Sequence, residues 1–97
     1  MMFVRMHTHG DERIVAACDE ELIGMTFRGD GTRITVHEEF YRGESLDEEA
    51  FVERLRIATI INLVGDGVIG IAIREGLVSP ESVMEIGGVR HAQAVLL

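Results

Sequence analysis

The chain contains no lysine, so all nine of its basic residues are arginines. Amides are almost as scarce, because Asn62 is the only asparagine and Gln93 the only glutamine. Few thermolabile amides are typical of hyperthermophile proteins, which are nevertheless usually rich in lysine. The missing lysine therefore points instead to a GC-rich genome or to a salty cytoplasm that tolerates acidic proteins.

Cysteine is nearly absent too, and the single Cys18 excludes an internal disulfide or a CxxC redox or metal pair. Its acidic neighbours, residues 19–21, would raise the pKa of the thiol and weaken its nucleophilicity, so we expect a buried structural cysteine. The sequence also contains no GxSxG motif, which excludes the nucleophile elbow of the α/β-hydrolases. No catalytic residue and no cofactor is predicted.

Long apolar runs are missing, and the N-terminus has no apolar signal region, so we predict a cytoplasmic protein without a membrane span. The 97 residues predict a single domain, 1–97, and 46% hydrophobic residues suffice for a core. The net charge of −8 fits either solubility in its habitat or a basic partner. It opposes non-specific binding to DNA or RNA, which needs clustered positive charge.

The first half of the chain reads as hairpins. Residues 2–9 and 12–19 alternate as strands around a Gly10-Asp11 turn, so direct cross-strand partners should have numbers that sum to 21. Residues 19–24 read as one helical turn, residues 25–37 as a second hairpin around "GDG", and "EEFYRGE" closes the strand region.

Two apolar helices are predicted next. The first spans 45–65 with a capping box of Ser45 and Glu48, and the second follows an Asp66 cap and ends at Gly76. Residues 57–73 are apolar on nearly every side, so we expect them to be buried helix, covered by the sheet or by a second copy in a homodimer. A short turn at 79–82, a strand "VMEI" and an edge or pairing strand at 89–97 complete the chain. The predicted fold is α+β, with a mostly antiparallel sheet of hairpins and two main helices packed on one face.

The sequence pattern gives only weak support for a phosphate-binding loop and for a metal site. "GDGVIG" lacks the lysine and hydroxyl of a Walker loop and follows a predicted helix instead of a strand, so we do not expect phosphate there. His7 and His9 share a strand face and could chelate a metal, but a catalytic zinc requires a third ligand, and surface histidines explain the pair as well.

The stretch "IGGVRHAQ", residues 86–93, has the strongest functional character. Gly87 and Gly88 could expose backbone N–H groups as an anion-binding nest, or they could simply form a hairpin turn. Arg90, His91 and Gln93 follow, and alternation places the last two on one face. Asp19 or Glu20 could supply a carboxylate to His91. These seven residues are the candidate binding site.

The order of several segments resembles an archaeal family of small proteins, the domain of unknown function 424. The segments are "VAACDEELIGMTF", "EEFYRGE", "ATIINLVGDG", "AIREGLVSPESVMEIGG" and "HAQ". The matching positions are Cys18, Asp19, Glu20, Asn62, Gly65, Gly76, Gly87, Gly88, His91 and Gln93. The resemblance implies an archaeal, cytoplasmic, single-domain α+β protein of no established activity. It also implies a gene that lies among genes for translation and RNA processing.

We therefore predict a non-catalytic binding module that contacts a protein or ribonucleoprotein partner through the "GGVRHAQ" edge. Two alternatives remain open at this point. One is a small enzyme that uses His91 with a nearby carboxylate, and the other is a metal-binding protein that uses His7 and His9.

Overall fold

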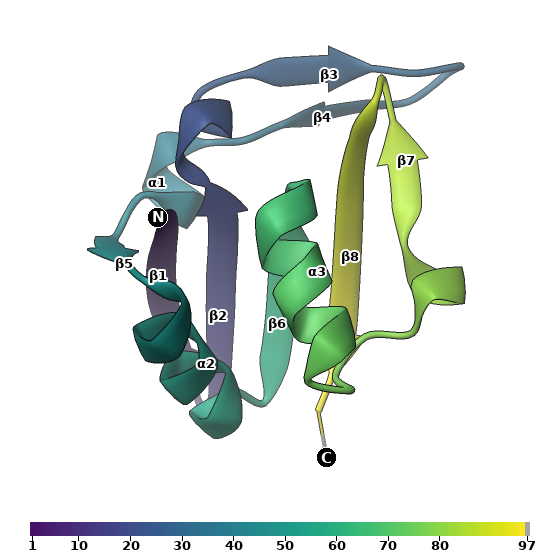
Figure 1. Ribbon diagram of the computed structural model, residues 1–97. Helices are drawn as coiled ribbons and strands as arrows, with labels where there is room; N and C mark the ends of the chain where they lie inside the picture. Colours follow the sequence, from purple (N-terminus) through teal and green to yellow (C-terminus); the bar gives the residue numbers. More distant parts are fainter. Residues whose placement is uncertain (97) are drawn as a thin grey trace.

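Six strands form the main sheet, in the order β5-β1-β2-β6-β8-β7 (Figure 1). The structure is a computed structural model that describes residues 1–96. The strands are Met2–His9 (β1), Glu12–Asp19 (β2), Glu44–Leu46 (β5), Ile60–Val64 (β6), Met84–Ile86 (β7) and Val89–Val95 (β8). All neighbours are antiparallel except β2 and β6, which run parallel. The α+β class and the mostly antiparallel sheet are confirmed.

The first hairpin has the predicted register. Met2 pairs with Asp19 and His9 with Glu12, so each pair sums to 21. Val4, Val15 and Ala17 are buried on one face, whereas Arg5 and the half-buried His7 lie on the other. The alternation of apolar and polar residues thus fixes which face meets the core.

Helices cover both faces of this sheet. Glu48–Ile57 (α2) and Asp66–Arg74 (α3) pack on one face, as predicted. The short helix Glu38–Tyr41 (α1) and the hairpin of Thr26–Arg28 (β3) and Arg33–Thr35 (β4) cover one end of the opposite face. Single 3₁₀ turns lie at Glu20–Leu22 and Pro80–Ser82.

The prediction of one helix across 45–65 is wrong. The helix ends at Ile57, and Ala58 already has extended backbone angles, with ψ at 147°. Residues 60–64 form β6, which lies between β2 and β8 in the middle of the sheet. Ile61 and Leu63 face the helices, and Val64 packs in the cluster under the hairpin and α1. The strand is mostly apolar because one side is covered throughout and the other side is covered at its Val64 end.

The ends of the two helices also differ from the prediction. Asp47 caps α2 by accepting a hydrogen bond from the Ala50 N–H at 2.9 Å, so Ser45 is not the cap. Gly65 occupies the cap position of α3, one residue before Asp66. At the far end the prediction is confirmed: Gly76 has a φ of +76°, and the Leu77 N–H donates to the carbonyl of Ala72 at 2.9 Å.

The C-terminal segment is a pairing strand, one of the two predicted alternatives, and not an edge strand. β8 pairs with β6 on one side and with β7 on the other, because β7 folds back along it. Leu97, which the predicted strand included, lies outside the described residues. The edges of the sheet are β5 and β7.

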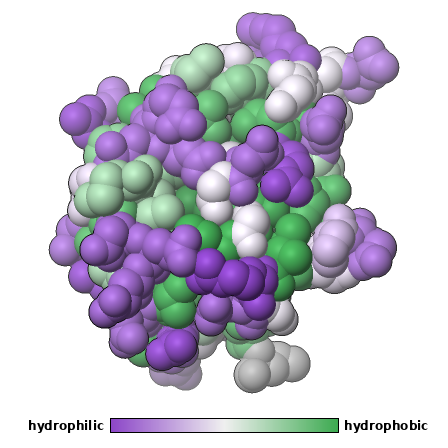
Figure 2. Space-filling model, viewed as in Figure 1, coloured by the Kyte–Doolittle hydropathy of each residue, from purple (hydrophilic) through white to green (hydrophobic). Residues whose placement is uncertain are grey.

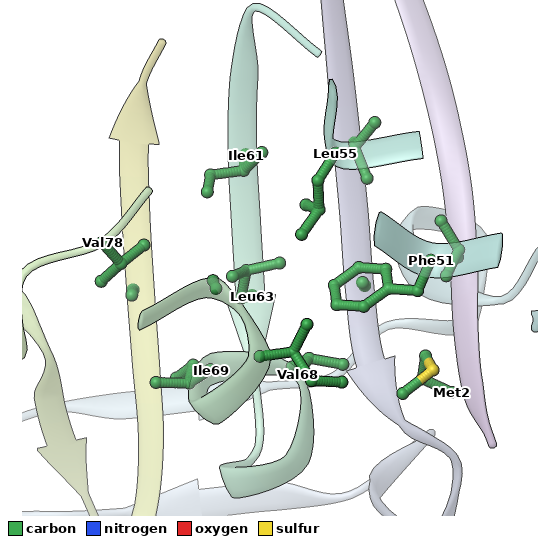
Figure 3. Close-up of a cluster of buried hydrophobic side chains, with 14 of the residues drawn as sticks. Met2, Phe51, Leu55, Ile61, Leu63, Val68, Ile69 and Val78 are labelled. Atoms are coloured by element: carbon green, nitrogen blue, oxygen red, sulfur yellow. The ribbon is translucent and has the colours of Figure 1, made fainter. Parts of the chain in front are cut away.

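The main core lies between α2, α3 and the sheet (Figure 3). Phe51 and Leu55 of α2, Val68 and Ile69 of α3, and Leu63 of β6 are all essentially inaccessible to water. The apolar side of α3 is therefore covered within one chain, without a second copy. Cys18 is buried on the opposite face, as predicted, and burial together with the acidic neighbours raises the pKa of its thiol to about 12. Within residues 1–96, no helix has the length and hydropathy needed to span a bilayer.

Candidate functional site

The part of the sheet that α2, α3 and the β3–β4 hairpin leave uncovered forms the candidate site, with α1 at its border, and we call it the open face. It lies on the side of the sheet away from α2 and α3, where residues of β1, β2, β6, β7 and β8 form adjacent rows. Its nine residues are Arg5, His7, Ile14, Ile60, Asn62, Met84, His91, Gln93 and Val95. None of the nine carries a carboxylate, although the chain has 17 acidic residues. Within residues 1–96, the one acidic strand residue on this side of the sheet is Glu12, exposed opposite His9 at the start of β2.

The other side of the molecule differs in character. Purple, hydrophilic side chains cover much of the helix side, especially around α2 (Figure 2). On the open face, Met84 is 54% exposed and Val95 is 69% exposed, which are high values for large apolar residues. Apolar groups and uncharged polar groups are therefore mixed on this face, and Arg5 is the one charged side chain among the nine.

A polar network occupies the middle of the open face. Tyr41 lies on α1 and is buried, and its hydroxyl donates a hydrogen bond to Oδ1 of Asn62 at 2.5 Å. Nε2 of His91 lies 3.3 Å from the same oxygen. Because an amide oxygen can only accept, His91 must carry its proton on Nε2, and its Nδ1 is left as an acceptor.

The groups in this network are uncharged near neutral pH. Burial raises the pKa of Tyr41, with a smaller effect from Cys18, so the phenol keeps its proton. Burial lowers the pKa of His91, so the imidazole is neutral. The network therefore positions hydrogen-bonding groups and does not supply a charge.

Two atoms of the network remain available to a partner. The amide nitrogen of Asn62 and Nδ1 of His91 have no hydrogen-bond partner within residues 1–96. Every buried side-chain nitrogen or oxygen in that range is satisfied, so both atoms reach solvent. The open face thus offers one donor and one acceptor in neighbouring strands, with Gln93 directly opposite Asn62.

The pKa of His91 gives a testable pH dependence. Because the folded pKa lies below the ordinary value of 6.5, the unfolded chain binds the proton more readily than the folded one. As the pH falls below 6.5, the wild type should therefore lose free energy of unfolding relative to His91→Gln. Urea unfolding of both proteins at a series of pH values measures the difference. A difference that is independent of pH, or that grows in favour of the wild type at low pH, would contradict the lowered pKa.

A second constellation lies where β2 and β6 end and α3 begins. Oδ2 of Asp19 accepts from the N–H of Gly67 at 2.9 Å, and Oδ1 accepts from the N–H of Val68 at 3.0 Å. A glycine-containing loop does follow a strand here, contrary to the prediction of a preceding helix. The N–H groups at the start of α3 could in principle hold a phosphate, but the carboxylate of Asp19 already accepts their hydrogen bonds. This contact, and not a preceding helix, is the structural argument against a phosphate-binding loop here.

The comparisons with known proteins agree with this fold. The family model described as "Protein of unknown function (DUF424)" matches residues 7–97. The chain belongs to this family. A crystal structure of an uncharacterized conserved protein from Methanopyrus kandleri is similar to the DUF424 chain over 99% of its length and 91% of the other chain, with 28% identity and a TM-score of 0.85. No curated protein matches.

In this DUF424 protein the seven predicted site residues separate into several places. His91 and Gln93 lie on the open face, whereas Arg90 points to the helix side and its Nε donates to Oδ1 of Asp66 at 2.7 Å. Glu20 accepts a hydrogen bond from Ser45, and Asp19 holds the start of α3. Neither carboxylate is hydrogen-bonded to His91, whose partner within residues 1–96 is Asn62.

The two glycines of the predicted nest form the turn between β7 and β8. Both have positive φ, +59° at Gly87 and +86° at Gly88, as a two-residue hairpin requires. A Cβ at Gly87 would lie 2.5 Å from the carbonyl oxygen of Arg28, so the turn packs tightly against β3. This close packing explains why residue 87 is a glycine, and no bound anion is needed to explain it.

The histidines of β1 are likewise separated. His7 stacks on Phe40, with ring centroids 4.6 Å apart, and its Nε2 lies 2.8 Å from the carbonyl oxygen of Phe40. His9 is exposed at the end of β1. Within residues 1–96, no three histidine, cysteine or acidic side chains are grouped as metal ligands.

Asn62 and Tyr41 are the network residues that the site prediction did not include. Asn62 was singled out only as a position of the family resemblance. A stronger signal was available: it is the one polar side chain in the apolar run "IINLV", and a polar group in such a run requires a hydrogen-bond partner. Tyr41 gave no comparable signal, because α1 brings it to Asn62 from 21 residues away.

Proposed function

We propose that the protein is a non-catalytic binding module whose open face docks a protein, alone or within a ribonucleoprotein. The scarcity of carboxylates on this face, where Glu12 at the start of β2 is the one acidic strand residue within 1–96, is the observation that carries the proposal, because the chain has a net charge of −8. The centres of protein interfaces are depleted in charge and combine apolar area with a few hydrogen bonds. Met84 and Val95 supply the apolar area, and Asn62 and His91 supply the hydrogen bonds.

The distribution of arginines favours a protein over bare nucleic acid. Arg42, Arg54, Arg74 and Arg90 form ion pairs with acidic residues at separate places on the surface. Arg28 and Arg33 face each other on the β3–β4 hairpin, apart from the others. Nucleic acid requires a continuous basic surface, and scattered ion pairs do not provide one.

The test compares the wild type with Val95→Asp, which places a charge on the open face at an exposed position. Met25→Asp is the matched control, because Met25 is 45% exposed and lies next to β3. From native cells, the wild type and Met25→Asp should co-purify with the same partner protein, and Val95→Asp should lose it. Recovery of the wild type alone at every salt concentration, or equal retention by both variants, would contradict the proposal.

A further inference from the structure

A groove of about 460 Å³ lies on the helix side, at the end of the molecule where α2 and α3 finish, which is at the bottom of Figure 1. Its apolar lining comes from Val52, Leu55, Ala58, Leu77 and Leu96. Three charged residues, Arg13, Arg56 and Glu75, also line it. Small-molecule sites in proteins have similar volumes and combine an apolar surface with a few polar groups.

The charges of the groove differ in sign from those of the whole chain. Two guanidinium groups and one carboxylate give it a formal charge of +1, whereas the chain carries −8. Glu75 already lies 3.4 Å from Nη2 of Arg74. Its charge is thus partly compensated outside the groove, which leaves the two arginines as the dominant charges.

Arg13 is held in place without an acidic partner. Its backbone N–H donates to Oγ1 of Thr59 at 2.8 Å, and its Nε donates to the carbonyl oxygen of Ile57 at 2.5 Å. Within residues 1–96, its two terminal nitrogens have no hydrogen-bond partner. A positioned guanidinium with two such nitrogens matches the geometry of a carboxylate.

Arg56 is the second cation and is only loosely paired. Its Nη1 lies 3.4 Å from Glu53, and the two side chains are 65% and 67% exposed. Such exposed pairs contribute little, so the pair can open at small cost. Arg56 is therefore able to turn toward a ligand.

We propose that this groove binds a small molecule with an apolar body and one carboxylate. The carboxylate pairs with Arg13 and Arg56, and the apolar body covers Leu55, Ala58, Leu77 and Leu96. A monoanion matches the charge of the groove. The site is independent of the open face, because it lies on the other side of the sheet.

The experiment titrates the ¹⁵N-labelled full chain with octanoate and follows the amide shifts. We expect saturable shifts at Ala58, Thr59 and Leu77, and weaker effects from octylammonium, which has the same tail and the opposite charge. Equal shifts with both molecules would show a purely apolar contact and would overturn the proposal. Shifts that do not saturate, or that lie on the open face, would also overturn it.

A charge-matched pair of variants completes the test. Arg56→Glu should weaken octanoate binding about tenfold, the order expected for the loss of one charge-assisted hydrogen bond. Arg33→Glu makes the same change of net charge on the β3–β4 hairpin and should leave the affinity unchanged. Equal weakening by both would indicate a long-range effect of net charge and contradict a carboxylate site. Val95→Asp should bind octanoate like the wild type, so the outcome is separate from that for the open face.

Discussion

Replacing Gly65 with alanine is expected to lower the free energy of unfolding by about 3–5 kcal/mol. Gly65 has a φ of +117°, a region that side chains rarely tolerate. A Cβ there would also lie 2.5 Å from Oδ2 of Asp19 and 2.9 Å from Cδ1 of Leu22. Backbone strain and the displaced carboxylate therefore act together, because Asp19 must leave the N–H groups of Gly67 and Val68. Urea unfolding followed by circular dichroism measures the loss.

Gly70→Ala is the matched control for this prediction. Gly70 lies within α3, is exposed, and has no atom within 4 Å of the position of an added Cβ. Alanine should therefore stabilise the protein by about 0.5–1 kcal/mol through its higher helix propensity. Changes of the same sign at Gly65 and Gly70 would contradict the described junction between β6 and α3.

Phe51→Ala is expected to cost about 3–5 kcal/mol, the usual range for loss of a fully buried aromatic side chain. Phe51 is inaccessible to water and reaches from α2 into the cluster that also contains Leu63 and Val68 (Figure 3). Removing the ring leaves a cavity between α2, α3 and the sheet, which these backbones can close only in part. Thermal or urea unfolding measures the change.

The control for Phe51 is Ile57→Ala at the end of the same helix. Ile57 is 49% exposed, so its truncation removes little buried area and should cost less than about 1 kcal/mol. Similar losses at both positions would mean that α2 does not present Phe51 to the core as described.

The hairpin of β1 and β2 could be predicted to the residue, because one face is apolar, the other mixed, and the turn has two residues. β6 could not be distinguished from helix in the same way. Apart from Thr59 and Asn62, residues 58–64 are apolar, and a buried strand cannot be distinguished from a buried helix by such a pattern. The β-branched residues Thr59, Ile60, Ile61 and Val64 favour a strand and are the signal that could have decided it.

The candidate site was predictable only in part, for a related reason. Alternation along one strand places His91 and Gln93 on the same face, and the structure agrees. Their neighbours come from β6 and α1, which are distant in the sequence, so the partner of His91 depends on the strand order. The helix predicted for 45–65 left β6 out of the sheet, so a carboxylate of Asp19 or Glu20 was expected beside His91 in place of Asn62.

The two outermost strands, β5 and β7, are each only three residues long. Long unpaired strands at the border of a sheet are templates for fibre growth, because they expose rows of free N–H and carbonyl groups. Here β5 pairs only with residues 2–4 of β1, and β7 pairs only with residues 89–91 of β8, so each border of the sheet is divided into two short, offset rows. Short rows of this kind are poorer templates than one long edge strand. We therefore expect that the protein can leave a broad area of its sheet with few charges in contact with water, because the broken borders disfavour edge-to-edge growth of fibrils.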